Sequence, residues 1–282
     1  NTRLIPAEEV SSWACFWNPE NKGKMLMKDS YWDVYNIASI YGNYSDISSG
    51  KRTLYEVAND HTPKDFHTVE NKIKEMRPYL AGWEADFGKE MMTRGEIWFT
   101  YAWSGDAVWA IEEAAAVGVN LDYVVPNEGS NIWFDGWVIP KYARNTKAAS
   151  YFLAYLCQSE VAMRNMDVCG YSSVVATPEI ADAKTDAEIE QSSNLSYFFG
   201  KGYEKMHIDP IQYPDSSVVA RCAIFNDFLD KNDTMLELWS RAKGDSMNME
   251  MAIFIFGTFF LLAVWLIYRR ILKYKRNRRI RY

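Results

Sequence analysis

The stretch Asp122–Lys141, DYVVPNEGSNIWFDGWVIPK, decides the fold expected of this chain. An apolar, strand-like run at 123–125 leads into a polar turn, and a second strand-like run then carries Trp133 and Asp135. In an extended chain, residues two apart point to the same face, so the Trp133 indole and the Asp135 carboxylate are expected side by side. Trp137 continues that face if the strand runs on unbroken.

An indole beside a carboxylate suits an organic cation. The face of the ring attracts a positive charge, and the carboxylate pairs with it through charge-assisted hydrogen bonds. The same pattern is also typical of a half-buried strand in which Trp133 belongs to the core and Asp135 to a turn. Periodicity leaves both interpretations open.

Strands and helices are expected to alternate along the chain. Residues 25–27 form a short apolar run before a helix from Ser30 to about residue 41, and EIWFTY at 96–101 precedes a helix at about 104–117. This alternation indicates an α/β architecture, in which ligands bind beyond the carboxyl ends of strands. Trp103 lies at the second strand-to-helix corner. It could line a cleft there or simply pack on the sheet.

Asp33 also has two alternative roles. Ser30 followed three residues later by Asp33 matches a capping pattern, in which the hydroxyl accepts a backbone N–H and the carboxylate reaches back. The other role is a carboxylate at the mouth of a cleft. Neither role can be preferred on the pattern alone.

The remaining segments give coarser predictions. The segment at 42–63 is polar and turn-rich. Helices are expected at 8–17, 67–80, 145–157 and 158–168, with Gly170 stopping the last of them.

The charge of the chain is strongly uneven. The net charge is −6, yet residues 269–282 hold eight of the 31 Lys and Arg, which leaves 23 basic against 36 acidic residues up to residue 249. An acidic body disfavours nucleic acid as a partner and favours small cations.

An apolar run precedes the basic tail. Residues 251–268, MAIFIFGTFFLLAVWLIY, carry no charge and match the length needed to cross a bilayer core of about 30 Å. The positive-inside tendency then places residues 1–245 outside the membrane, 246–250 as a linker and 269–282 in the cytoplasm. A buried core helix is the alternative.

Motifs that would indicate catalysis are absent from the sequence. It contains no Gly-rich phosphate loop, GxSxG elbow or HExxH motif, and its four Cys and three His show no spacing typical of a metal site. We therefore predict a non-enzymatic protein without metal or cofactor. Paired carboxylates beside aromatic platforms leave a membrane-tethered carbohydrate-active enzyme as an alternative.

Several segments, in order, resemble one family. They are SSWACFWNPENKGKMLM, KDSYWDVYNIA, GEIWFTYAWSGDA, LDYVVPNEGSNIWFDGWVIPKYARN and CGYSSV. This set is similar to the spermidine/putrescine-binding proteins of bacterial ABC importers. The resemblance implies a type II, two-lobe clamshell whose first lobe is partly missing here. The second lobe would span about 4–134 and 179–245, and the remaining part of the first lobe about 135–178.

The resemblance also implies roles for individual residues. Trp133 and Asp135 match the "W-x-D" of the family, in which the Trp packs on the methylenes of the polyamine and the Asp pairs with an ammonium. Trp103 matches a second cage Trp, Asp33 an acidic contact to an ammonium, and Tyr171 a cage tyrosine.

Two further positions depart from the family. Ser30 stands where some members have a second carboxylate, and Phe225 where a glutamine occurs. Losing these polar anchors leaves the length of the ligand open.

The function implied is that of an extracytoplasmic substrate-binding component, in the periplasm or at the cell surface. It would capture spermidine or putrescine and deliver it to the permease subunits and ATPase of an ABC importer, anchored in the membrane by residues 251–268. A binding protein for another organic cation or a metal is the alternative within the same class.

Overall fold

The computed structural model describes residues 1–244, 256–262 and 264–270. The chain divides into two compact units, Asn1–Leu238 and Trp239–Tyr282. Its strands are β1 (Met25–Lys28), β2 (Gly82–Glu84), β3 (Phe99–Thr100), β4 (Ser130–Asn131) and β5 (Cys222–Ala223). Its helices are α1 (Ala7–Val10), α2 (Tyr31–Gly42), α3 (Tyr44–Ser48), α4 (Leu54–Asn59), α5 (Pro63–Met76), α6 (Gly88–Thr93), α7 (Ser104–Ala116), α8 (Thr146–Leu156), α9 (Ser159–Cys169), α10 (Pro178–Lys184), α11 (Ser196–Phe199), α12 (Ser216–Ala220) and α13 (Asn232–Lys243).

A parallel sheet of order β2-β1-β3 forms the centre of the first unit. All four residues of β1 are buried, as expected of the middle strand of a parallel sheet covered on both faces. The register pairs Lys28 with Glu84, so the carboxyl ends of β1 and β2 bring these two residues together. A separate parallel pair joins Asn131 of β4 to Ala223 of β5.

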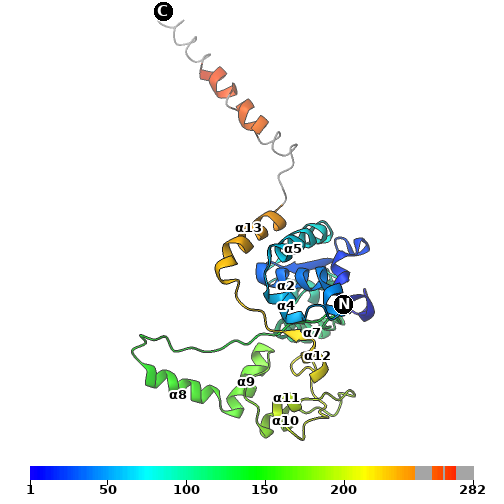
Figure 1. The fold of residues 1–282 in the computed structure, drawn as a ribbon, viewed down its shortest axis with the longest axis vertical. Helices are drawn as coiled ribbons and strands as arrows, with labels where there is room; N and C mark the ends of the chain where they lie inside the picture. Colours follow the sequence, from blue (N-terminus) through cyan, green and yellow to red (C-terminus); the bar gives the residue numbers. More distant parts are fainter. Residues whose placement is uncertain (245–255, 263, 271–282) are drawn as a thin grey trace, which may run out of the picture. The chain divides into compact units, whose positions relative to one another are not determined.

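Two long helices of the first unit, α2 and α5, begin at side-chain caps. The Ser30 hydroxyl accepts the Asp33 N–H at the start of α2, and Thr62 with Asp65 forms a complete capping box at the start of α5. Figure 1 shows α2, α4 and α5 gathered in one part of the first unit.

A second core lies among the later helices. Met166 of α9 and Ile180 of α10 are buried there with Leu195, Ile208 and Tyr213. The α9 helix ends at Gly170, whose φ of 75° is the left-handed conformation that favours glycine at a helix end.

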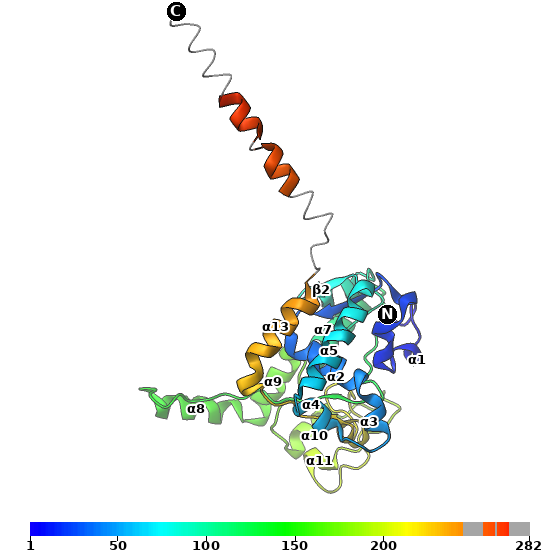
Figure 2. The same cartoon turned by 45° about the horizontal axis from the view of Figure 1, so that its top comes forward.

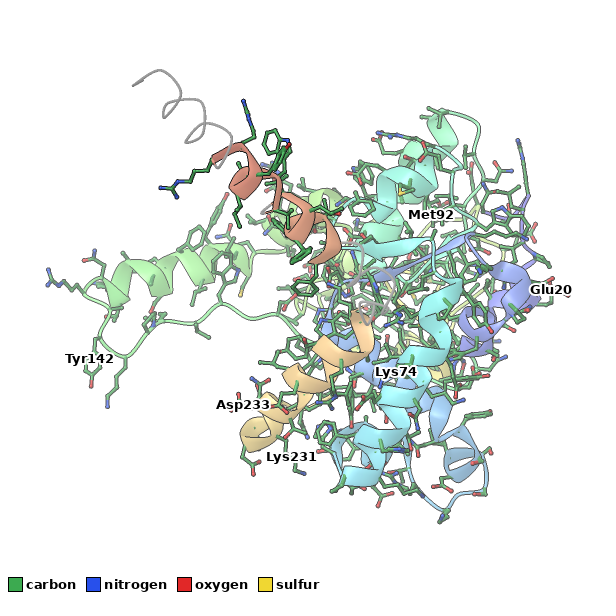
Figure 3. All side chains as sticks on the ribbon, turned by 90° about the horizontal axis from the view of Figure 1, so that it is seen from above. Glu20, Lys74, Met92, Tyr142, Lys231 and Asp233 are labelled. Atoms are coloured by element: carbon green, nitrogen blue, oxygen red, sulfur yellow. The ribbon has the colours of Figure 1, made fainter. Side chains whose placement is uncertain are left out.

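The segment at 133–157 forms an arm with exposed apolar side chains. None of the α8 residues is buried, and Figures 1 and 2 show α8 apart from α2 and α5 in both views. Trp137 is 74% exposed and Tyr142 87% exposed. Figure 3 shows Tyr142 on the arm, pointing away from the other elements of the first unit.

The predicted strand at 25–27 and the predicted helices at 30–41, 104–117, 145–157 and 158–168 are confirmed, each within a residue or two. The segment at 42–63 is not turn-rich as predicted, because α3 and α4 form there. The capping box of Thr53 with Glu56 starts α4 in a sequence whose composition otherwise suggested turns. The expected helix at 8–17 is divided into α1 and a 3₁₀ helix, Trp13–Trp17.

The predicted strand at 123–125 does not join a ladder. Side chains hydrogen-bond to this segment instead. The Val125 carbonyl accepts from Arg221 Nη2 at 3.0 Å, and the Tyr123 N–H donates to Asp122 Oδ1 at 2.7 Å. The following run pairs only at β4, so the expected second strand is also shorter than predicted.

The expected membrane span and its flanks lie partly outside the described residues. Residues 256–262 and 264–270 are helical, with exposed apolar side chains such as Phe259 and Trp265. Within the described ranges, no helix has both the length and the apolar character needed to span a bilayer. The linker at 246–250 and the tail from 271 onward fall outside those ranges.

Candidate functional site

Trp133 and Asp135 lie side by side, as their two-residue spacing predicts. The indole Nε1 of Trp133 donates a hydrogen bond of 3.3 Å to Asp135 Oδ2, and both side chains are exposed. Trp137 does not continue this face. Its ring packs edge-on against Phe152 of α8, with centroids 6.1 Å apart, because the backbone has left the ladder before it.

Tyr171 completes an aromatic corner with Trp133. The two rings meet edge to face, with centroids 6.1 Å apart and an interplanar angle of 76°. Gly105 of α7 makes room for the tyrosine, since a Cβ there would lie 2.3 Å from Tyr171 Cε2. Burial raises the pKa of the Tyr171 phenol, and the charges of Asp106 and Asp135 raise it further. The phenol therefore stays protonated and able to donate at neutral pH.

Asp33 is a buried carboxylate with a phenol as its partner. It lies in the first turn of α2 and is buried, and Tyr101 donates a hydrogen bond of 3.0 Å to its Oδ1. The helix start uses only the Asp33 backbone, because the Ser30 hydroxyl accepts that N–H at 3.3 Å. Burial first, and then the Asp33 charge, raise the pKa of Tyr101, which keeps this donor protonated.

Trp103 directly precedes α7, at its N-cap position but without a capping side-chain hydrogen bond, and an ammonium group of the protein itself lies over its ring. Lys28 Nζ lies 4.3 Å from the centroid of the Trp103 ring. The same Nζ is 3.0 Å from Glu84 Oε1 and 3.5 Å from Asp106 Oδ2. Lys89 reaches the other oxygen of Asp106 at 3.2 Å.

A cavity of about 150 Å³ runs between β3, α7 and the segment at 121–126. Its lining is mainly apolar, with Lys28 and Asp106 among its charged groups and Tyr101, Tyr123 and Trp133 among its aromatic ones. The cavity therefore connects the lysine cluster with the Trp133 corner.

The structure brings the predicted residues together to different degrees. Trp133, Asp135 and Tyr171 form one corner, whereas Asp33 is linked to it only through its hydrogen bond with Tyr101, which lines the same cavity as Trp133. Ser30 joins only as the helix cap.

Phe225 is a buried residue beyond β5 and has no ring contact with Trp133 or Tyr171 among the described residues. Sequence reasoning missed Lys28, Glu84, Asp106 and Tyr101. Lys28 directly follows the strand predicted at 25–27 and Tyr101 ends the strand predicted at 96–101, and those positions were the available signal.

The described residues hold neither a metal-type cluster nor a disulfide. Nowhere in residues 1–244, 256–262 and 264–270 do three or more His, Cys, Asp or Glu gather as a metal site would require. The cysteines are free thiols, with Cys15 buried, Cys222 half-buried, and Cys157 and Cys169 exposed.

Comparison with known proteins identifies the family. The sequence model of the family described as bacterial extracellular solute-binding protein matches residues 1–195. The chain belongs to this family. Members are solute-binding components of transport systems, which agrees with the non-enzymatic class predicted from the sequence.

Curated relatives of this solute-binding protein include polyamine binders. The spermidine/putrescine-binding periplasmic protein of Escherichia coli K12 is 28% identical over 197 residues, which cover 67% of this chain and 52% of the relative. The spermidine/putrescine-binding periplasmic protein of Salmonella typhimurium LT2 is 25% identical over 244 residues, which cover 86% of this chain and 60% of the relative. The chain thus spans about half to three fifths of the length of the curated relatives it matches.

Solved structures of similar fold confirm the α/β architecture. A spermidine/putrescine ABC transporter substrate-binding protein from Streptococcus pneumoniae matches with a TM-score of 0.59 and 22% identity, over 83% of this chain and 61% of that one. A proposed spermidine/putrescine ABC transporter from Listeria monocytogenes matches with a TM-score of 0.63 and 22% identity, over 86% and 64%.

Proposed function

We propose that this chain is the extracytoplasmic substrate-binding component of an ABC importer and that it captures a polyamine, spermidine or putrescine. Membership of the solute-binding family and the ligands named for its relatives support this function. The observation that carries it is the Trp133–Asp135 pair, closed on one side by Tyr171.

The chemistry of a polyamine fits this corner. Such a molecule alternates ammonium groups with apolar methylenes, so it needs carboxylates at intervals and ring faces between them. Asp135 and the buried Asp33 supply carboxylates, and Trp133 and Tyr171 supply rings. Each desolvated cation–π contact contributes about 1–2 kcal/mol, and each charge-assisted hydrogen bond roughly 1.5–3 kcal/mol. A few such contacts reach micromolar affinity, about −8 kcal/mol.

The other predicted residues have supporting roles in this proposal. Trp103 forms the far wall of the site, Ser30 holds the start of α2 so that Asp33 is fixed, and Phe225 closes the apolar side near β5. The ligand is released to the permease subunits of the importer, which its ATPase drives. The chain itself carries out no catalysis.

The arrangement of domains is also part of the proposal. The second lobe spans about 4–134 and 179–245, and 135–178 belongs to the first lobe. The separate core around Met166 and the exposed apolar arm at 133–157 support a boundary between the two lobes near residue 134. The uncharged run at 251–268 and the basic residues after it support a single membrane crossing, with the binding domain outside. Retention in the membrane pellet after alkaline carbonate washing tests that anchor.

Calorimetric titration of two site variants tests the function. Trp133→Ala and Asp135→Asn each remove one half of the pair, and we expect each to weaken binding of putrescine and spermidine at least tenfold. Trp137→Ala, at an exposed ring on the arm, and Asp182→Asn, at an exposed carboxylate of α10, serve as matched controls that retain affinity. Normal binding by both site variants would show that the site lies elsewhere.

A further inference from the structure

Lys28 is a buried lysine whose hydrogen-bonding capacity is fully used. It ends β1 and is only 4% exposed. Its Nζ donates to the Ala85 carbonyl at 2.8 Å and pairs with Glu84 at 3.0 Å and Asp106 at 3.5 Å. An ammonium has three N–H donors, so these three acceptors saturate it. The group is therefore held in one place.

That place is the face of an aromatic ring. The Lys28 ammonium lies 4.3 Å from the Trp103 ring centroid, within the range of a cation–π contact. The protein thus presents to Trp103 the same group that an amine ligand would present. One face of this indole is already covered by a cation.

The charges around Trp103 are also already balanced. Glu84 and Asp106 are the carboxylates of this cluster, and Lys28 and Lys89 are its ammonium groups, with Lys89 3.2 Å from Asp106. Two negative and two positive charges leave no net charge for an incoming cation. Asp135 and Asp33 differ, because their described hydrogen-bond donors, an indole N–H and a phenol, are neutral.

We propose that Lys28 is a specificity-determining residue that occupies an ammonium subsite at Trp103, so that the chain takes a diamine in preference to a triamine. This inference rests on the proposed function. Asp33 and Asp135, which have no cationic partner among the described residues, supply one carboxylate for each ammonium group of a diamine. The additional ammonium of a triamine would meet the positive charge of Lys28 when it reached Trp103.

Titration of the full chain and three variants with putrescine and spermidine tests the role of Lys28. Lys28→Met removes the ammonium while keeping an unbranched apolar stem. The single variant Lys28→Met leaves Glu84 buried without its partner. The double variant Lys28→Met/Glu84→Gln avoids this by replacing both members of the ion pair with neutral groups of similar size. Lys89→Met is the matched control: it removes the same charge from Asp106 but leaves Lys28 on Trp103. Thermal unfolding shows which variants are folded.

The ratio of the two affinities decides the outcome. We expect the unaltered chain to bind putrescine more tightly, and Lys28→Met to improve spermidine relative to putrescine by roughly tenfold, the size of one cation–π contact. Lys89→Met should leave the ratio unchanged. If Lys28→Met does not fold, the double variant is judged by the same ratio. An unchanged ratio in the folded variants, or a preference of the unaltered chain for spermidine, overturns the inference alone. Binding of neither amine by any form overturns the proposed function as well.

Discussion

Gly105 fixes the position of Tyr171, and replacing it with alanine should displace the tyrosine. Gly105 is the second residue of α7 and is buried. An added Cβ would lie 2.3, 2.5 and 2.6 Å from Cε2, Cδ2 and Cζ of Tyr171. Carbon atoms in contact keep about 3.5–4.0 Å between them, so the ring has to move by more than an ångström. Trp133 bounds the tyrosine on another side.

Two opposing effects determine how far Gly105→Ala changes the free energy of unfolding. Alanine is better than glycine inside a helix by about 0.5–1 kcal/mol, which favours the variant. Overpacking a filled site costs about 1–3 kcal/mol, which disfavours it. Gly105→Ala should therefore lower the free energy of unfolding by about 1–2 kcal/mol and weaken amine binding at the same corner.

A double-mutant cycle read by urea unfolding isolates this contact. In a Tyr171→Ala background the new methyl group has space, so Gly105→Ala should be neutral or slightly stabilising, with a coupling energy of about 2 kcal/mol. Gly136→Ala is the control, because its Cβ meets nothing within 4 Å. An equal loss of stability in both backgrounds would refute the steric reasoning.

Three further predictions concern single polar groups. Tyr101→Phe removes the hydroxyl that donates to buried Asp33, and should lower the free energy of unfolding by about 1.5–3 kcal/mol in a urea titration; an unchanged midpoint would mean that the bond is not formed. Although burial opposes its ionisation, hydrogen bonds from Arg52 and Thr62 hold the pKa of Asp65 below its ordinary value of 3.8. Its contribution to stability is thus present above about pH 4 and lost as the pH falls through the lower, folded-state pKa. Asp65→Asn should therefore be less stable than the unaltered chain at pH 7 and should lose less stability as the pH falls below 4. Parallel curves of unfolding free energy against pH for the variant and the unaltered chain would contradict this. Ser30→Asp keeps a good helix cap and adds a carboxylate beside Asp33, so stability should stay within about 0.5 kcal/mol while calorimetry shows tighter amine binding; Ser30→Ala should instead lose about 1 kcal/mol of stability.

Local patterns predicted the elements whose signals are contained within a few residues. The helix from Ser30 and the stop at Gly170 depend on a hydroxyl cap and on a left-handed residue, both visible in sequence. The adjacency of Trp133 and Asp135 follows from backbone alternation alone, and it holds even though the ladder ends at residue 131.

Contacts between distant residues could not be predicted in this way. The Lys28–Trp103 contact joins two strand-to-helix corners 75 positions apart, and only the parallel pairing of β1 with β3 brings them together. The carboxylate of Asp33 was a candidate for capping, yet Tyr101, 68 residues later, holds it instead. The strand expected at 123–125 failed for a related reason, since whether a ladder forms depends on the neighbouring segment and not on the apolar run itself.

The central claim is that this chain recognises a cation with spaced ammonium groups. Calorimetric titration with putrescine and, in parallel, with 1,4-butanediol tests it most directly, because the two molecules share a four-carbon chain and differ in charge. We predict saturable binding of putrescine, in the micromolar range or tighter, and no measurable heat with the diol. Equal binding of both molecules, or binding of neither, would contradict the account.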